Sequence, residues 1–390
     1  MNAFMKPILL ASYRSACPAL HIFLPARSLR TLDPLYFNTP GVLVRASVQR
    51  SSRTRGITTS FRTSVFTSRA SGTSSCSSTR RMNANSASPG DLAGFTLPMP
   101  TVSASWLQDH LDSVKVVDAS WYMPNVDRDA KAEFEGKRIP GAVFLDLDGV
   151  ADMAVELPHM LPSPGAFSAA ADALGISNDS PVVVYDGSGL FSAARAWWMF
   201  KAFGHRQVAT LEGGLPGWEE RGYKVEVAPP AVDVLAGTNA VRAVDTNTVP
   251  AGKYQAALDP AAVRSVTQML ANLESSEEQV VDARSAGRFA GTAPEPRAGI
   301  RGGHIPNSCN VPFDIVLSKD KGLKSEAELK EIFTASGLCL DGKPIAATCG
   351  TGVTACVLAL ALDKIGVKNV SVYDGSWTEW GGREDTPVVP

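Results

Sequence analysis

The sequence lacks the long apolar runs and the paired cysteines that would indicate a membrane protein or a disulfide-stabilised scaffold. No uninterrupted apolar stretch approaches the ~18 residues that a membrane-spanning helix needs. Six cysteines occur in 390 residues, without C-x-x-C metal spacing and without the density of a disulfide framework. We therefore expect no membrane span, no metal site and no organic cofactor, and the cysteines suit a reducing compartment.

Acidic residues are almost absent from the first 90 residues, where Asp33 stands alone against twelve Lys and Arg. Ser and Thr crowd residues 51–88 of the same stretch. An Arg-rich, Ser-rich, acid-poor segment is typical of an organelle transit peptide, so we predict that residues 1–90 are disordered or cleaved. The expected compartment is the mitochondrion, with the chloroplast as an alternative. Translation from Met82 would instead give a shorter cytosolic form.

Basic residues are scarce in the remainder, because residues 91–390 hold 25 Lys and Arg against 38 Asp and Glu, a net charge of −13. Binding to a nucleic-acid backbone depends on Lys and Arg that neutralise phosphates, so nucleic acid is not an expected partner. An anionic substrate must then be held by a few placed arginines.

The remaining 300 residues contain an internal repeat. Four landmarks recur at an offset that stays within 162–166 residues, a register that chance similarity would not hold. The matching segments are 116–119 and 280–283, 138–141 and 304–307, 182–187 and 345–350, and 211–218 and 373–380. We predict two copies of one domain, over 98–226 and 261–390, joined by a Pro- and Gly-containing linker over 227–260.

Each copy alternates short apolar runs with helical patterns. The runs 182–185 and 345–348 are apolar throughout, as expected of parallel strands that are covered on both faces. Each run is followed by a Gly-containing turn and then by a helical pattern, over 192–203 and 354–365. This order predicts an α/β fold in which each copy is a parallel β-sheet with helices on both faces.

The turn after the run 345–348 is the strongest chemical signal in the sequence. It begins with Cys349 and contains Gly350 and Gly352, which allow the backbone to curl so that successive amides point inward. With a helix N-terminus behind them, those amides would stabilise the thiolate of Cys349 and a persulfide formed on it. The first copy has Asp186 at the matching position, and a carboxylate cannot accept sulfur. We therefore expect the first copy to be catalytically silent.

The loop Cys-Gly-Thr-Gly-Val-Thr-Ala (349–355), taken with the segment 373–380, resembles the tandem rhodanese-type sulfurtransferases. It is most similar to the 3-mercaptopyruvate sulfurtransferases, in the organellar form found in plants. The resemblance implies two tandem rhodanese-like domains and assigns substrate binding to Gly350, Gly352, Val353 and Thr354. Thiosulfate-preferring members usually carry Arg-Lys after the cysteine, whereas this chain has Gly350 and Thr351, which implies 3-mercaptopyruvate as the donor.

The same resemblance implies roles for residues outside the loop. Arg288 and Arg297, in a Pro-rich segment, would hold the carboxylate and keto group of the donor; taken alone, two such arginines are more often solvated charges. Asp148, His159 and the hydroxyl of Thr351 would form a relay beside the sulfur, with Thr351 in a place where many relatives have Ser. Acceptors implied by the family are thiols such as thioredoxin or glutathione, or cyanide, and the expected state is a monomer.

The sequence bears on three alternative functions. A Cys-loop phosphatase needs an arginine six residues after the cysteine, and that position is Ala355. A thiosulfate sulfurtransferase of the same fold stays open, because donor preference depends on kinetics. A non-catalytic rhodanese-type regulatory module is disfavoured by the presence of Cys349. Cys356, one helical turn after the loop, is expected in the core rather than as a redox partner.

Overall fold

The structure is a computed structural model that describes residues 37–39, 42–44, 95–227 and 254–390. The chain divides into two units, Met1–Ser86 and Ala87–Pro390. In the first unit the described residues form one antiparallel pair of strands, β1 (Phe37–Thr39) and β2 (Val42–Val44). The rest of the predicted presequence, and residues 228–253 of the predicted linker, lie outside the described residues.

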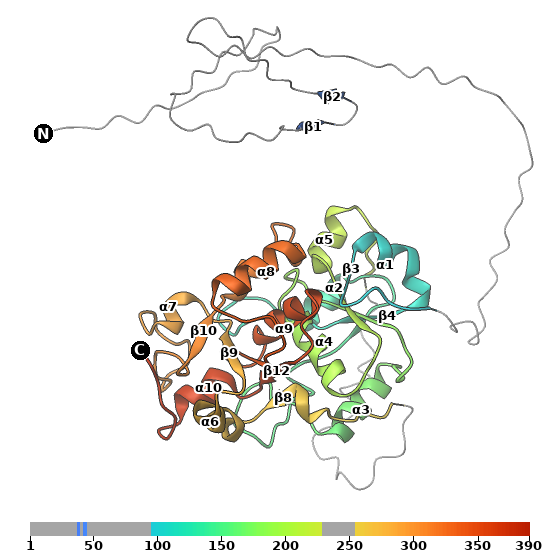
Figure 1. Cartoon of the computed structure of the whole chain (residues 1–390). Helices are drawn as coiled ribbons and strands as arrows, with labels where there is room; N and C mark the ends of the chain where they lie inside the picture. Colours follow the sequence, from blue (N-terminus) through green and yellow to red (C-terminus); the bar gives the residue numbers. More distant parts are fainter. Residues whose placement is uncertain (1–36, 40–41, 45–94, 228–253) are drawn as a thin grey trace, which may run out of the picture. The chain divides into compact units, whose positions relative to one another are not determined.

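The second unit contains two five-stranded sheets of the same topology (Figure 1). The strands of the first sheet are β3 (Thr101–Val102), β4 (Lys115–Asp118), β5 (Val143–Phe144), β6 (Val182–Tyr185) and β7 (Val208–Leu211). Those of the second are β8 (Val263–Arg264), β9 (Gln279–Asp282), β10 (Ser308–Asn310), β11 (Ile345–Thr348) and β12 (Val370–Tyr373). The strand orders β3-β7-β6-β4-β5 and β8-β12-β11-β9-β10 correspond one to one, and every pairing within them is parallel. The predicted duplication and the predicted parallel sheets are therefore confirmed.

Helices follow the strands in both copies. In the first copy they are α1 (Ala104–His110), α2 (Ala130–Gly136), α3 (Pro164–Ala173), α4 (Ala193–Ala202) and α5 (Gly214–Glu220). In the second they are α6 (Val266–Ser275), α7 (Ala286–Phe289), α8 (Glu326–Ala335), α9 (Ala355–Lys364) and α10 (Ser376–Gly382). Serine fixes several helix starts by accepting a hydrogen bond from a first-turn amide, and Ser265 and Ser325 form complete capping boxes with Gln268 and Glu328.

Successive residues of the central strands enter different cores, because side chains alternate between the two faces of a sheet. Val182 and Val184 of β6 belong to one cluster, whereas Val183 and Tyr185 belong to another that includes residues of α1 and α5. In the second copy Ile345 and Ala347 face the first cluster, and Ala346 faces a cluster with residues of α6 and α10. Both faces of each sheet are thus covered by helices, which explains the continuous apolar runs.

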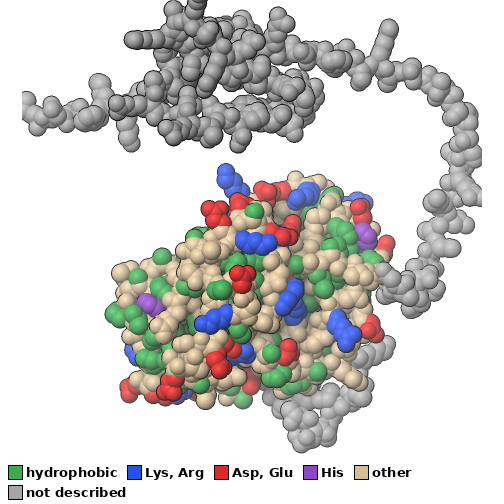
Figure 2. Space-filling model, viewed as in Figure 1, with side chains coloured by type: hydrophobic (Ala, Val, Ile, Leu, Met, Phe, Trp, Pro, Cys, Tyr) green, Lys and Arg blue, Asp and Glu red, His purple; other side chains and the backbone are tan. Residues whose placement is uncertain are grey.

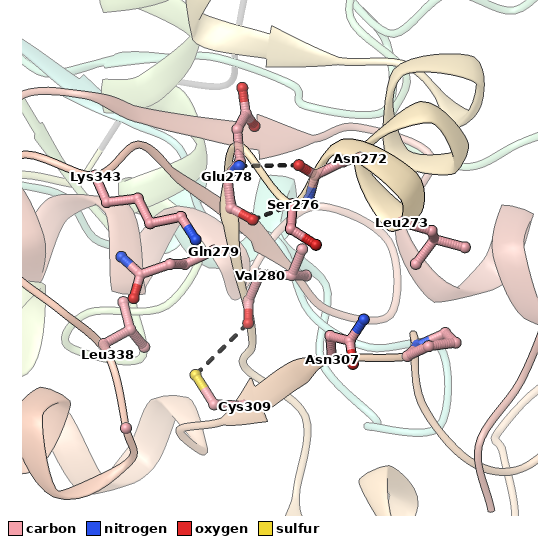
Figure 3. Close-up of a pocket in the computed structure, with 12 residues that line it drawn as sticks. Asn272, Leu273, Ser276, Glu278, Gln279, Val280, Asn307, Cys309, Leu338 and Lys343 are labelled. Atoms are coloured by element: carbon pink, nitrogen blue, oxygen red, sulfur yellow. Dashed lines mark hydrogen bonds between the residues drawn. The ribbon is translucent and has the colours of Figure 1, made fainter.

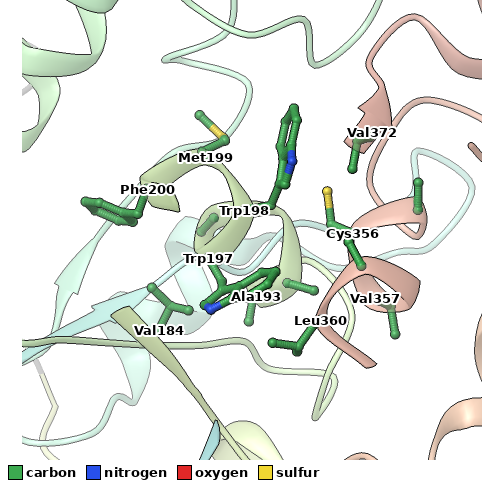
Figure 4. Packing of buried hydrophobic residues seen from close by; sticks show 14 of the residues in the cluster. Val184, Ala193, Trp197, Trp198, Met199, Phe200, Cys356, Val357, Leu360 and Val372 are labelled. Atoms are coloured by element: carbon green, nitrogen blue, oxygen red, sulfur yellow. The ribbon is translucent and has the colours of Figure 1, made fainter. Parts of the chain in front are cut away.

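One hydrophobic core is shared by the two copies. It contains residues of α3 and α4 from the first copy and of α8 and α9 from the second. Trp197 and Trp198 of α4 lie against Cys356 and Leu360 of α9 (Figure 4). Since α4 and α9 are the helices that follow the two equivalent loops, this packing holds the two loops near the boundary between the copies.

The end of the predicted linker is ordered against the first copy. Tyr254 is buried and packs on Phe167 and His205, and the amide of Asp259 donates a 2.7 Å hydrogen bond to the carbonyl of Ala202. On the face of the second unit shown in Figure 2, Lys and Arg side chains are interspersed with acidic ones rather than gathered in one patch. Within the described residues, no helix is long and apolar enough to span a bilayer.

Candidate active site

Cys349 lies directly after β11, at the carboxyl end of the second sheet, where ligands of parallel α/β sheets bind. Its side chain is buried, with the residue 1% exposed. The start of α10 fixes the beginning of the loop: Cys349 donates its amide to Ser376 Oγ at 3.2 Å, and Trp377 donates its amide to the Cys349 carbonyl at 2.9 Å. Thr378 donates both its amide and its hydroxyl to the carbonyl of Gly350.

The backbone amides of residues 350–354 have no hydrogen-bond acceptor among the described residues. Gly352 produces the curl, with φ of +77°, a conformation that favours glycine. A Cβ at this position would lie 2.8 Å from Nη1 of Arg195 and 2.9 Å from the carbonyl oxygen of Asp374. Glycine is therefore required both by the backbone conformation and by the closeness of its neighbours.

The equivalent loop of the first copy shows what such a turn binds. There the carboxylate of Asp186, the residue in the place of Cys349, is buried and accepts four backbone hydrogen bonds. The donors are the amides of Ser188 at 2.8 Å, Gly189 at 2.9 Å, Phe191 at 2.7 Å and Ala193 at 2.8 Å. The turn therefore encloses a negative group, and in the first copy the chain supplies that group itself.

The second copy has the same donors without the carboxylate. By the repeat, the four amides correspond to those of Thr351, Gly352, Thr354 and Cys356. The Cys356 amide bonds within the turn at 3.1 Å, whereas the other three have no acceptor in the described structure. Since unpaired amides are rare in the interior of folded proteins, the three form a set of open hydrogen-bond donors in the Cys349 loop.

Arg288 lies against the loop, and its Nη2 would be 3.2 Å from a Cβ placed on Gly350. Its guanidinium is oriented by buried Glu295, whose Oε2 accepts from Nε at 3.1 Å and from Nη2 at 2.5 Å. The other oxygen of Glu295 accepts from Nη1 of Arg284 at 2.8 Å, and Arg284 also forms a forked pair with Asp282. Burial raises the pKa of Asp282 above its ordinary value, and the adjoining Arg284 opposes that shift. A series of ion pairs, from Asp282 through Arg284 and Glu295 to Arg288, therefore ends at the Cys349 loop.

His159 and Asp148 of the first copy are in contact, with 2.9 Å between Nδ1 and Oδ1. Trp121 braces the pair, since its indole N–H donates to Oδ2 of Asp148 at 2.8 Å and its ring meets the imidazole edge-to-face at 4.5 Å. The hydrogen bond with His159 lowers the pKa of Asp148. Nε2 of His159 is buried and has no hydrogen-bond partner in the described structure, so this nitrogen is available to exchange a proton.

Two stretches of the chain match the family described as "Rhodanese-like domain", residues 103–221 and 265–383. The chain belongs to the rhodanese-like family of tandem sulfurtransferases. It is 47% identical over 295 residues to thiosulfate/3-mercaptopyruvate sulfurtransferase 1, mitochondrial, of Arabidopsis thaliana, covering 74% of this chain and 78% of that protein. It is 42% identical over 292 residues to 3-mercaptopyruvate sulfurtransferase of Escherichia coli K12, covering 74% and 97%.

A solved structure supports the same assignment. The crystal structure of SseA from Escherichia coli, described as having the rhodanese fold, matches with a TM-score of 0.60 and 38% identity. The match covers 71% of this chain and 98% of that one. The family and fold that the motifs predicted are therefore confirmed.

The structure brings some of the predicted site residues of this tandem rhodanese into contact. Arg288 contacts the Cys349 loop, and His159 contacts Asp148. Thr351 is buried and has no hydrogen bond to His159 or Asp148 in the described structure, so the contact between His159 and Asp148 is the part of the predicted relay that is formed there. Arg297 is half-buried and has neither an ion pair nor a hydrogen bond with any described residue. Its guanidinium is thus free to bind an anion.

Four buried charged residues beside the site were missed by the sequence analysis: Arg195, Asp374, Arg284 and Glu295. A buried and paired Arg195 was predictable, because this residue is the one cation before Lys201 in the apolar pattern 192–203. A charge on a buried helix must be paired. Glu295 stands between two prolines in a loop, where no periodicity indicates burial.

A cavity of about 250 Å³ lies elsewhere, at the amino end of β9 (Figure 3). Its lining includes Asn272, Gln279, Asn307, Cys309 and Lys343. Burial raises the pKa of the Cys309 thiol to about 11, which keeps it protonated and unsuited to nucleophilic attack near neutral pH. Cys356 is in the core, as expected, and burial raises its pKa well above the ordinary value. Among the described residues, no cluster of three or more His, Cys, Asp or Glu could hold a metal ion.

Replacing Asp186 tests whether the turn itself binds a negative group. We expect Asp186→Ala to lower the free energy of unfolding by about 3 kcal/mol or more, because four buried amides lose their acceptor. Added formate should restore part of the loss by occupying the vacated position. Urea unfolding followed by tryptophan fluorescence measures both effects.

Asp186→Asn is the matched control, since its carbonyl oxygen still accepts hydrogen bonds, and it should lose less stability than Asp186→Ala. An alanine variant within about 0.5 kcal/mol of the parent, with no response to formate, would show that the amides do not depend on an anion.

Proposed function

We propose that this protein carries sulfur as a persulfide on Cys349, with 3-mercaptopyruvate as the donor. The observation that supports it most is the set of unpaired amides in the loop that follows Cys349, at positions equivalent to those that bind a carboxylate in the first copy. A thiolate and a persulfide are both anions, so the same amides would stabilise the nucleophile and the intermediate.

The reaction has two displacement steps. The Cys349 thiolate attacks the donor sulfur, a sulfur–sulfur bond forms, and the carbon–sulfur bond breaks with its electron pair passing to carbon. Protonation of the resulting enolate gives pyruvate. In the second step a thiolate acceptor, such as thioredoxin or glutathione, or cyanide attacks the outer sulfur, and the sulfur–sulfur bond breaks to regenerate the Cys349 thiolate. Electrons and atoms balance without an added oxidant or reductant.

The charges around the loop favour a keto acid over thiosulfate. Gly350 and Thr351 place no cation directly after the cysteine, whereas Arg288 lies at the loop and Arg297 carries an unpaired guanidinium. The guanidinium groups of these two arginines suit a donor whose carboxylate lies at some distance from the transferred sulfur. Gly352, Val353 and Thr354 complete the backbone wall of the donor site. The Arabidopsis relative is named for both donors, so thiosulfate is the second candidate.

His159 is proposed to supply the proton that the enolate needs. Its Nδ1 lies 2.9 Å from Oδ1 of Asp148 and its Nε2 has no hydrogen-bond partner among the described residues, an arrangement that suits a general acid. Thr351, next to Gly350 in the loop, would extend the relay if its hydroxyl turns toward His159 when donor is bound.

The proposed compartment is the mitochondrion. An Arg-rich, acid-poor segment precedes the first rhodanese copy, and the Arabidopsis relative is named as mitochondrial. The proposed functional state is a monomer, because both copies that build the site lie in one chain.

Cys349→Ser is expected to abolish sulfur transfer from either donor and to leave the unfolding transition unchanged, because oxygen cannot replace the sulfur carrier. In the parent protein, mass spectrometry after 3-mercaptopyruvate treatment should find one added sulfur on Cys349. Cys309→Ser, which alters the thiol in the remote cavity, is the matched control and should keep full activity. Pyruvate release from the Cys349→Ser variant would contradict the mechanism.

Arg297→Met is expected to raise KM for 3-mercaptopyruvate by about 10- to 100-fold with a small change in kcat. The reason is that the guanidinium would bind the donor carboxylate equally in the ground state and in the transition state, so its loss weakens both by the same amount. Steady-state kinetics with both donors separates the candidates. The ratio of kcat/KM for 3-mercaptopyruvate to that for thiosulfate should exceed one in the parent and fall in the variant. A parent ratio below one would favour thiosulfate.

A further inference from the structure

A buried ion pair joins the two copies beside the sulfur-carrying loop. Arg195 lies on α4 of the first copy and Asp374 directly follows β12 of the second, with Nη2 and Oδ1 2.8 Å apart. Their side chains are 1% and 5% exposed. A buried guanidinium is costly unless its N–H groups are paired, so its partners indicate what it is there to hold.

Arg195 reaches both halves of the proposed site. Its Nη1 donates to the carbonyl of Gly352, in the middle of the Cys349 loop, at 3.3 Å. Its Nη2 donates to the carbonyl of His159. The second oxygen of Asp374 accepts the amide of Leu161 at 2.8 Å, so the carboxylate ties down the same turn that carries His159.

These contacts help to fix the backbone of both turns, and the Gly352 carbonyl also accepts from Sγ of Cys356 at 3.1 Å. Gly352 has no side chain, and a planar peptide turns as a unit, so the direction of its carbonyl sets the orientation of the adjoining part of the loop. His159 also has a positive φ, of +62°, which an ordinary residue adopts only when its surroundings impose it. The guanidinium holds both turns at once through donors in one rigid plane.

We propose that Arg195 is a positioning residue for sulfur transfer, which sets the Cys349 loop and the His159 turn at a fixed separation across the boundary between the copies. The proposal rests on the proposed role of Cys349. It also gives the catalytically silent first copy a second task, since α4 then orients the loop as well as packing against α9.

Arg195→Lys tests the geometry while keeping the positive charge. A single ammonium group cannot hold the Asp374 carboxylate and two carbonyls of separate elements in one plane. We expect kcat for sulfur transfer to fall by about 100-fold, the loss that a misplacement near 1 Å can cause, with KM for 3-mercaptopyruvate changed less than about 3-fold because Arg288 and Arg297 are intact. The kinetics should be measured at a temperature well below the thermal unfolding midpoint of each variant.

Asp374→Asn keeps the assay informative if Arg195→Lys does not fold. The amide has the same shape and can still accept from Leu161, but it loses the charge that holds Arg195, so kcat should fall by about 10-fold. Lys201→Met is the matched control. It breaks a different ion pair, which joins α4 to Asp363 of α9 at 3.1 Å, without touching either turn, and should keep kcat and KM within about 2-fold of the parent.

The proposal is overturned if the folded Arg195→Lys and Asp374→Asn variants match Lys201→Met in kcat, or if they raise KM while kcat stays unchanged. Cys349→Ser, assayed alongside, separates this outcome from failure of the proposed function. If Cys349→Ser is inactive and Arg195→Lys is fully active, only the proposed role of Arg195 is refuted. If Cys349→Ser is active, the proposed function of Cys349 is refuted.

Discussion

Backbone amides that curl around one negative group are the constraint on which the rest of this structure depends. The two copies differ in the group that these amides can bind at equivalent positions. In the first, the carboxylate of Asp186 accepts from four amides, so the donors of the turn are paired within the chain. In the second, Cys349 replaces the carboxylate and leaves three amides without an acceptor, which are the donors that the proposed mechanism assigns to the thiolate and the persulfide. One exchanged side chain thus distinguishes a structural loop from a proposed catalytic one.

The first copy is nevertheless part of the proposed chemistry. It shares a core with the second copy through α4 and α9, and it supplies His159, Asp148 and Arg195. Arg195 crosses the boundary to the Cys349 loop, while Arg288 approaches that loop from within the second copy. Neither copy alone contains both the sulfur carrier and the groups that would orient it, which gives a physical reason for the tandem arrangement.

Local sequence patterns were sufficient for the fold and for the loop. The runs 182–185 and 345–348 coincide with β6 and β11, because strands buried on both faces are apolar throughout, and the Gly-containing turn after each run depends on adjacent residues. Pairings between distant residues were not accessible in this way. Arg195 and Asp374 are 179 residues apart, and nothing near either one indicates its partner. The motif named Arg297 and Thr351, but it could not show that the first stands unpaired or that the second lacks a bond to His159.

The most direct measurement is a crystal structure of the protein after treatment with 3-mercaptopyruvate. The account predicts an outer sulfur on Cys349 within hydrogen-bonding distance of the amides of Thr351, Gly352 and Thr354, in the position that the Asp186 carboxylate occupies in the first copy. A persulfide on Cys349 that points away from these amides, or extra sulfur on another cysteine while Cys349 is unmodified, would contradict it.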